Sequence, residues 1–297
     1  MSLVLSHDGS WPGFLCAVAE YLNLLRGPNA SRAGLRIEGP GLQAGLDDEI
    51  YPVTRDEQRA HSLLLRLIER IGGESNRSHV RMGQDPSPDR KLPTTKKRIL
   101  VGDEITRRVL RSLQAVFCSD TPGSDDAAAW MIARVFTVGT RAFDELGQPK
   151  GALFEKARNR LEREAHLFYG HSRFAELEDG SYYACIRPDC DVLLFIAEYF
   201  AARFPGMIWL IRDEKRGSGL SHTPGEGWSY WPVLEGPGGP LPLSDYERAI
   251  QAAWTVYHRD IAIRQRFNPK LQKAFLPQKF RHPGEPLGAL PCSQADS

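Results

Sequence analysis

The sequence of 297 residues has no long hydrophobic run, few cysteines and almost no excess of charge of either sign. Its longest apolar run falls well short of the roughly 18 residues that suggest a membrane-spanning helix. The N-terminus lacks a basic stretch followed by an apolar one, which is the pattern of a secretory signal. The cysteines are too sparse for a disulfide framework, since there are five of them: Cys16, Cys118, Cys185, Cys190 and Cys292. We therefore expect a cytoplasmic protein with free thiols and no membrane contact.

Motifs that would identify an enzyme by themselves are also missing. The sequence has no glycine-rich dinucleotide or phosphate loop, no Gly-x-Ser-x-Gly elbow and no Cys-x-x-x-Cys-x-x-Cys iron–sulfur motif. Cys185 and Cys190 lack the second cysteine pair that a zinc site would add. The sequence thus predicts neither a bound metal nor a cofactor. Because the net charge is only +1, an anionic partner would need a local cluster of basic residues.

Hydrophobic periodicity predicts helices and strands that are largely segregated along the chain. Helices are expected at 10–26, 59–71, 103–118, 124–146, 151–169, 189–205 and 244–263, and strands at 3–5, 173–177, 181–187, 207–211 and 228–233. Ser10 can cap the first helix, and Asp179-Gly180 is typical of a hairpin turn. We expect an α+β fold with one largely antiparallel sheet packed by several helices. Residues 1–297 would form a single domain with a flexible basic insert at 72–98 and a flexible tail at 283–297.

Polar side chains that could carry acid–base chemistry gather near 162–173 and at the end of one predicted strand. The candidate catalytic residues are Glu164, His166, His171 and Asp213. A carboxylate beside an imidazole can serve as an acid–base pair or as metal ligands. A network of surface ion pairs and helix caps explains the same residues without any catalysis. For the charged turn at 213–216, a functional role and a structural one are equally favoured.

A basic segment near the C-terminus carries the clearest physical signal for a partner. Residues 259–281 contain seven basic side chains, with Asp260 as the only acid and with Phe267, Phe275 and Phe280 between them. Basic groups bind phosphates, and aromatic rings can stack on exposed bases. The alternative is that the rings anchor the segment while the charges face water. The 72–98 insert also has a basic excess, with seven basic residues and three acidic ones.

Several blocks in the sequence, taken together and in order, resemble one family. They are Asp8-Gly9-Ser10, LEREAH at 161–166, GHSRF at 170–174, YYACIRPDCDVL at 182–193, FAARFP at 200–205, WLIRDEKR at 209–216, NPKLQ at 268–272 and LPQKF at 276–280. The chain resembles the DNA metabolism and DNA repair proteins that carry the domain of unknown function four-one-three-zero. Members are typically encoded beside a radical-SAM protein related to DNA photoproduct lyases, and some are fused to a uracil-DNA glycosylase-like domain.

The resemblance implies a role in DNA repair, and three hypotheses follow. The first is a DNA-binding accessory protein that leaves the chemistry to a radical-SAM or glycosylase partner. Its DNA contacts would be Arg173, Lys215, Arg216, Arg264, Arg266, Asn268, Lys270, Lys273, Lys279 and Arg281. The second is an enzyme that acts on DNA through Glu164, His166, His171 and Asp213. The third is a protein–protein adaptor without affinity for DNA.

Overall fold

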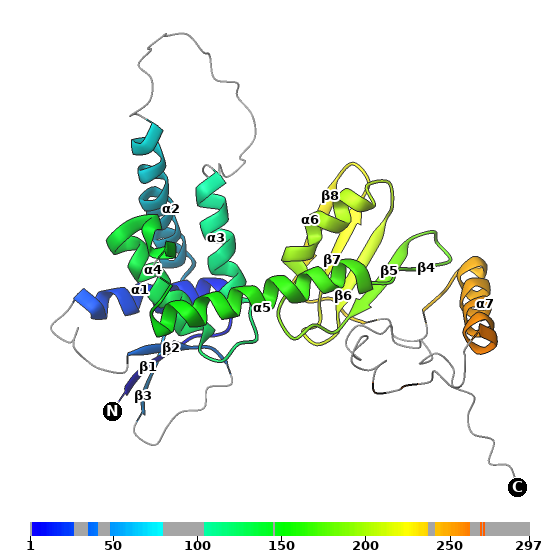
Figure 1. Cartoon of the computed structure of the whole chain (residues 1–297), viewed down its shortest axis with the longest axis horizontal. Coiled ribbons are helices and arrows are strands. Elements are labelled where there is room, and N and C mark those ends of the chain that lie inside the picture. Colours follow the sequence, from blue (N-terminus) through cyan, green and yellow to red (C-terminus); the bar gives the residue numbers. More distant parts are fainter. Residues whose placement is uncertain are drawn as a thin grey trace, which may run out of the picture. The chain divides into compact units, whose positions relative to one another are not determined.

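The computed structural model describes residues 2–26, 35–40, 48–79, 104–144, 146–236 and 241–261, together with Asn268 and Lys270. The chain divides into two compact units, Met1–Leu161 and Glu162–Ser297, which are described one at a time. Both units combine helices with strands, so the expected α+β class is confirmed (Figure 1). Folding as a single domain stays a prediction. Residues 80–98 of the expected insert and the tail at 283–297 lie outside the described residues.

The first unit contains a small parallel sheet. Its strands are β1 (Ser2–Ser6), β2 (Arg36–Glu38) and β3 (Asp48–Pro52), in the order β2-β1-β3. Both neighbours run parallel to β1, with Leu5 opposite Ile37 on one side and Tyr51 on the other. Helix α1 (Trp11–Arg26) lies between β1 and β2 in the chain. A connection of this length returns the chain to the end of the sheet at which β1 began, which makes the two strands parallel.

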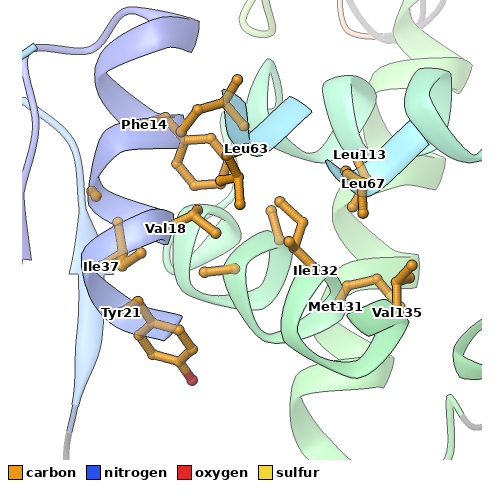
Figure 2. Packing of buried hydrophobic residues seen from close by; sticks show 14 of the residues in the cluster. Phe14, Val18, Tyr21, Ile37, Leu63, Leu67, Leu113, Met131, Ile132 and Val135 are labelled. Carbon is orange, nitrogen blue, oxygen red and sulfur yellow. The ribbon is translucent and has the colours of Figure 1, made fainter. Parts of the chain in front are cut away.

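The core of the first unit lies between its helices and the strands β1 and β2. After α1 come α2 (Glu57–His79), α3 (Glu104–Phe117), α4 (Ser124–Val138), the short 3-10 helix η1 (Gly139–Asp144) and α5 (Pro149–His171). Figure 2 shows the buried side chains that α1, β2, α2, α3 and α4 contribute, namely Phe14, Val18, Tyr21, Ile37, Leu63, Leu67, Leu113, Met131, Ile132 and Val135. Such interiors are close-packed, and burial of apolar area is their main stabilising term.

Local sequence signals explain where α1 begins but not where α2 ends. The hydroxyl Oγ of Ser10 accepts a hydrogen bond from the Gly13 N–H at 3.0 Å, which confirms Ser10 as the cap of α1. The prediction that the second helix ends at residue 71 is wrong, because α2 continues through Gly72 and Gly73 to His79. Each glycine in a helix interior costs about 1 kcal/mol relative to alanine, which weakens a helix without forbidding it.

The second unit contains a mixed five-stranded sheet. Its strands are β4 (Ala175–Glu176), β5 (Tyr182–Ile186), β6 (Trp209–Asp213), β7 (Ser218–Thr223) and β8 (Gly227–Trp231), and they lie side by side in chain order. The pair β5–β6 is parallel, and the other three pairs are antiparallel. The β4–β5 hairpin turns at Gly180, which has a φ of 78°, so the hairpin prediction is confirmed.

Two helices flank this sheet in the chain. Helix α6 (Leu193–Arg203) connects β5 to β6, and α7 (Asp245–Ile261) follows β8 and lies beside β4 (Figure 1). The buried side of the sheet carries Ala184, Ile186, Trp209, Ile211 and Leu220. Phe200 of α6 contacts Trp209 edge-on, with 6.3 Å between ring centroids. Among the residues described, no helix is both long and apolar enough to cross a membrane.

The expectation of one largely antiparallel sheet is only partly right. Strand β1 belongs to a separate, wholly parallel sheet, and β5 runs parallel to β6 in the mixed one. The helical connections α1 and α6 are the physical cause, because each crosses over between parallel neighbours. Hydrophobic periodicity does not predict β2 and β3, which are short and carry charged residues at Arg36, Glu38, Asp48 and Glu49. Nor does it predict β7, whose glycine, serine and histidine residues give little hydrophobic signal.

Candidate functional site: a polar clamp and an exposed aromatic helix

Glu164, a candidate catalytic residue, binds the loop that follows β5. It lies on α5 and is almost fully buried. Its Oε1 accepts a hydrogen bond from the Asp189 N–H at 3.0 Å, and its Oε2 accepts one from the Cys190 N–H at 2.8 Å. Both carboxylate oxygens are therefore occupied by backbone donors. This arrangement positions the loop before α6.

Asp213, a second candidate, ends β6 and is also completely buried. Its Oδ1 accepts hydrogen bonds from the Lys215 N–H at 2.9 Å and from the Arg216 N–H at 3.3 Å. Its Oδ2 accepts a third from Nη1 of Arg216 at 2.9 Å. The carboxylate thus folds the turn between β6 and β7 and fixes the guanidinium group of Arg216. This is the pattern of an Asp side chain that stabilises a turn.

Arg216 connects the two carboxylates through the same loop. Its Nη1 donates to the Pro188 carbonyl oxygen at 3.2 Å, and its Nη2 donates to that of Asp189. Glu164 and Arg216 therefore hold residues 188–190 through their N–H and C=O groups respectively. We call Glu164, Asp213 and Arg216 the strand-end clamp, because they lie around the carboxyl ends of the parallel strands β5 and β6, where Ile186 pairs with Asp213.

Electrostatics around the clamp reflect burial and ion pairing. Burial raises the pKa of Asp191, which the charge of Arg216 partly offsets, and Oδ1 of Asp191 has no hydrogen-bond partner. A hydrogen bond from Arg187 lowers the pKa of Glu214. Burial, followed by the charge of Glu214, raises the pKa of Cys185 to about 11. The Cys185 thiol is therefore protonated at neutral pH, which is the opposite of an activated nucleophile.

The two candidate histidines do not join the clamp. His166 is exposed on α5, with its ring edge-on to Tyr169 at 5.7 Å between centroids. Glu164 is only two residues away on the helix, and residues with that spacing do not face each other. His171 ends α5 and is half-buried. Within the described ranges, no three His, Cys, Asp or Glu side chains gather as metal ligands would.

A buried histidine that no sequence motif indicates lies in the first unit. His7 follows β1, and its Nε2 lies 3.2 Å from Oδ2 of Asp125 on α4. Its Nδ1 accepts a hydrogen bond from the Gly9 N–H at 3.1 Å, so both ring nitrogens are occupied. The imidazole therefore ties the β1–α1 turn to α4. No spacing in the sequence connects positions 118 residues apart, so only the fold could reveal this contact.

The predicted DNA contacts fall into three groups. Arg173 and Arg216 make internal contacts, the former with Nη2 at 3.3 Å from Oε1 of Glu247 on α7. Lys215 is half-exposed, with Nζ 3.4 Å from the Asp189 carbonyl oxygen, whereas Asn268 and Lys270 are exposed. Arg264, Arg266, Lys273, Lys279 and Arg281 lie outside the described residues.

Helix α7 has its polar side turned toward the rest of the second unit, beside β4. Ser244 caps it by accepting a hydrogen bond from the Glu247 N–H at 3.0 Å. Glu247 is buried, and it accepts hydrogen bonds from Arg173 and, at 2.8 Å, from Nε2 of Gln251. Thr255 continues this line along the helix and is half-buried. The side of α7 that contacts the unit therefore consists of polar residues at four-residue spacing.

The large apolar residues of α7 are on its exposed side instead. Tyr246 is 67% exposed, Ile250 38%, Trp254 49% and Tyr257 53%. The rings of Trp254 and Tyr257 lie nearly parallel, 5.8 Å apart between centroids. We call these four residues the aromatic stripe. The sequence predicts the helix, and the spacing of four, four and three residues places these residues on one side, but it does not predict which side is exposed.

Comparison with family models gives a match to a family of unknown function. The model of the family described as Domain of unknown function (DUF4130) matches residues 122–283, from the start of α4 to the segment beyond α7. No curated protein matches the chain. The matched region is more than half of the sequence and contains the strand-end clamp, the aromatic stripe and the basic segment at 259–281. The chain therefore belongs to the DUF4130 family.

Proposed function

We propose that this protein is a DNA-binding accessory protein of DNA repair that leaves the chemistry to a partner enzyme. The observation that carries the proposal is the continuity of α7 with the basic segment. The helix exposes three aromatic rings, and the segment at 259–281, which begins in its last turn, has seven basic residues against one acidic residue. Rings and cations close together in the chain supply the two contacts that nucleic acids offer, to bases and to phosphates.

The strand-end clamp favours an accessory role over the enzyme hypothesis. The carboxylates of Glu164 and Asp213 both accept hydrogen bonds from backbone or guanidinium donors, and His166 is exposed on α5. A general base must reach the proton that it abstracts within hydrogen-bond distance. These three groups do not form such a centre. The partner that the resemblance implies, a radical-SAM protein or a uracil-DNA glycosylase-like domain, would supply the reaction.

The test is fluorescence anisotropy with labelled DNA over a series of salt concentrations. The triple variant Lys270→Gln, Lys273→Gln and Lys279→Gln should bind more weakly, and its log K should fall less steeply with log salt, because fewer counterions are released. The matched control removes three exposed basic residues of α3, Arg107, Arg108 and Arg111, by the same change to Gln. Equal binding by both variants would rule out the basic segment, and no binding by the native chain at low salt would refute the proposal.

The adaptor hypothesis is the second candidate, because Ile250 makes the aromatic stripe suitable for an apolar groove of a protein. Anchors at this spacing are typical of helix-in-groove recognition. Co-expression with the radical-SAM protein, followed by affinity purification, tests it. A stable complex that Trp254→Ala abolishes, together with absence of DNA binding at low salt, would favour the adaptor.

A further inference from the structure

Among the described residues, helix α7 exposes the side that an ordinary amphipathic helix would bury. Helices at the surface of a protein normally bury the apolar side and expose the polar side. Here Glu247 is the buried residue, whereas Tyr246, Trp254 and Tyr257 are between 49% and 67% exposed. Exposed aromatic rings at regular spacing are typical of a binding surface. A partner of this surface should have a chemistry that complements exposed aromatic rings.

The basic residues that follow the stripe in the sequence favour an anionic partner. The stripe leads into a segment with basic residues at Arg259, Arg264 and Arg266, followed by exposed Lys270, and Asp260 is the only acid in 259–281. An apolar groove on a protein would not need this charge, whereas a polyanion whose units also have flat apolar faces needs both features. Nucleic acids have that combination, because phosphates alternate with bases.

The spacing of the rings favours single-stranded over double-stranded DNA. Neighbouring residues of the stripe are three or four positions apart, so their Cβ atoms are about 5–6 Å apart. Bases in a duplex stack at about 3.4 Å and expose only their edges in the grooves. A duplex therefore offers no base face to the rings of Trp254 and Tyr257. Bases must be unpaired and separated from one another to stack on side chains at this spacing.

We infer that α7 binds single-stranded DNA, with unpaired bases stacked on Trp254, Tyr257 and Tyr246. The inference rests on the proposed function and adds a preference for unpaired bases over duplex. It also gives α7 a role in repair, since an unpaired or extruded base is the form in which enzymes act on a base. The polar contacts of Glu247 with Arg173 and Gln251 hold the helix in this orientation.

The experiment measures binding of oligothymidylate and of a duplex with equal phosphate number to the full chain. Trp254→Ala and Tyr257→Ala should each weaken oligothymidylate binding by about 5- to 150-fold, the range for loss of one base–aromatic stack. Trp254→Phe should restore most of the affinity. The matched control is Val256→Ala, because Val256 is 46% exposed on α7 but lies outside the stripe. Quenching of tryptophan fluorescence by oligothymidylate should decrease in Trp254→Phe, which reports stacking directly.

The binding measurements distinguish four cases. Tighter binding of oligothymidylate than of duplex, lost in Trp254→Ala but not in Val256→Ala, supports the inference. Equal affinity for both DNAs, with Trp254→Ala unchanged, overturns it while leaving the proposed function intact. Absence of binding to either DNA at low salt refutes both. Self-association of the native chain that Trp254→Ala abolishes would assign the stripe to a subunit interface and overturn the inference.

Discussion

Removal of the Glu164 carboxylate separates a structural role of this residue from a catalytic one. In Glu164→Ala, the N–H groups of Asp189 and Cys190 lose their acceptors at 3.0 and 2.8 Å inside the second unit. Leaving a buried donor unsatisfied costs about 1–3 kcal/mol, so the two together should lower the free energy of unfolding by about 2–6 kcal/mol. In Glu164→Gln one oxygen still accepts while the amide NH₂ faces a donor, and we expect roughly half of that loss.

The assay is urea unfolding at neutral pH, followed by tryptophan fluorescence, because Trp209 is buried in the core of the same unit. The control is Glu162→Gln, an exposed glutamate two residues earlier on α5, for which the change should stay within about 0.5 kcal/mol. An unchanged free energy of unfolding in Glu164→Gln, combined with loss of a DNA-dependent activity, would refute the clamp and restore the enzyme hypothesis.

Two further predictions concern titratable groups beside the clamp. Because burial raises the pKa of Asp191 above its usual 3.8, the folded state holds this proton more tightly than the unfolded state. The residue thus lowers stability as pH rises from 3.8 through the raised value. Asp191→Asn should flatten this part of a pH series of urea unfolding, whereas an unchanged slope would show that Asp191 is well solvated. The pKa of Cys185, raised from 9.0 to about 11, implies about 100-fold less thiolate at pH 8 than in a free cysteine. Cys185 should therefore react correspondingly slowly with iodoacetamide, as peptide mass mapping measures, and Glu214→Gln should accelerate the reaction; fast native alkylation would contradict the pKa.

Local chemistry made part of the fold predictable. Ser10 starts α1 because its hydroxyl oxygen binds the Gly13 N–H, and Gly180 forms the β4–β5 turn because it adopts a positive φ. Both signals act within a few residues. The apolar strand at 207–211 was likewise visible, and it corresponds to β6 shifted by two residues. The partners of the strands were not predictable in this way, since the parallel pairing of β5 with β6 depends on how α6 crosses over.

The strand-end clamp illustrates why polar residues in a sequence suggest chemistry that the fold does not perform. Glu164 and Asp213 are 49 positions apart and were grouped as acid–base candidates from their proximity to histidines or to a strand end. In the structure both residues hold the loop at 188–190. Glu164 accepts hydrogen bonds from N–H groups of the loop, and Asp213 binds Arg216, which donates to carbonyl groups of the loop. Buried carboxylates are expensive unless hydrogen bonds satisfy them, so a loop with unpaired donors explains their burial as well as catalysis would.

In helix α7 the opposite occurs, because the fold exposes a surface that the sequence pattern does not reveal. Periodicity identifies residues that share a side of a helix, as the spacing of Tyr246, Ile250 and Tyr257 does here. It does not say which side is covered, because that depends on what the neighbouring strand offers. Here Arg173, beside β4, forms an ion pair with Glu247, which is buried. The ion pair between Arg173 and Glu247 therefore lies on the covered side of α7, and the aromatic residues lie on the exposed side.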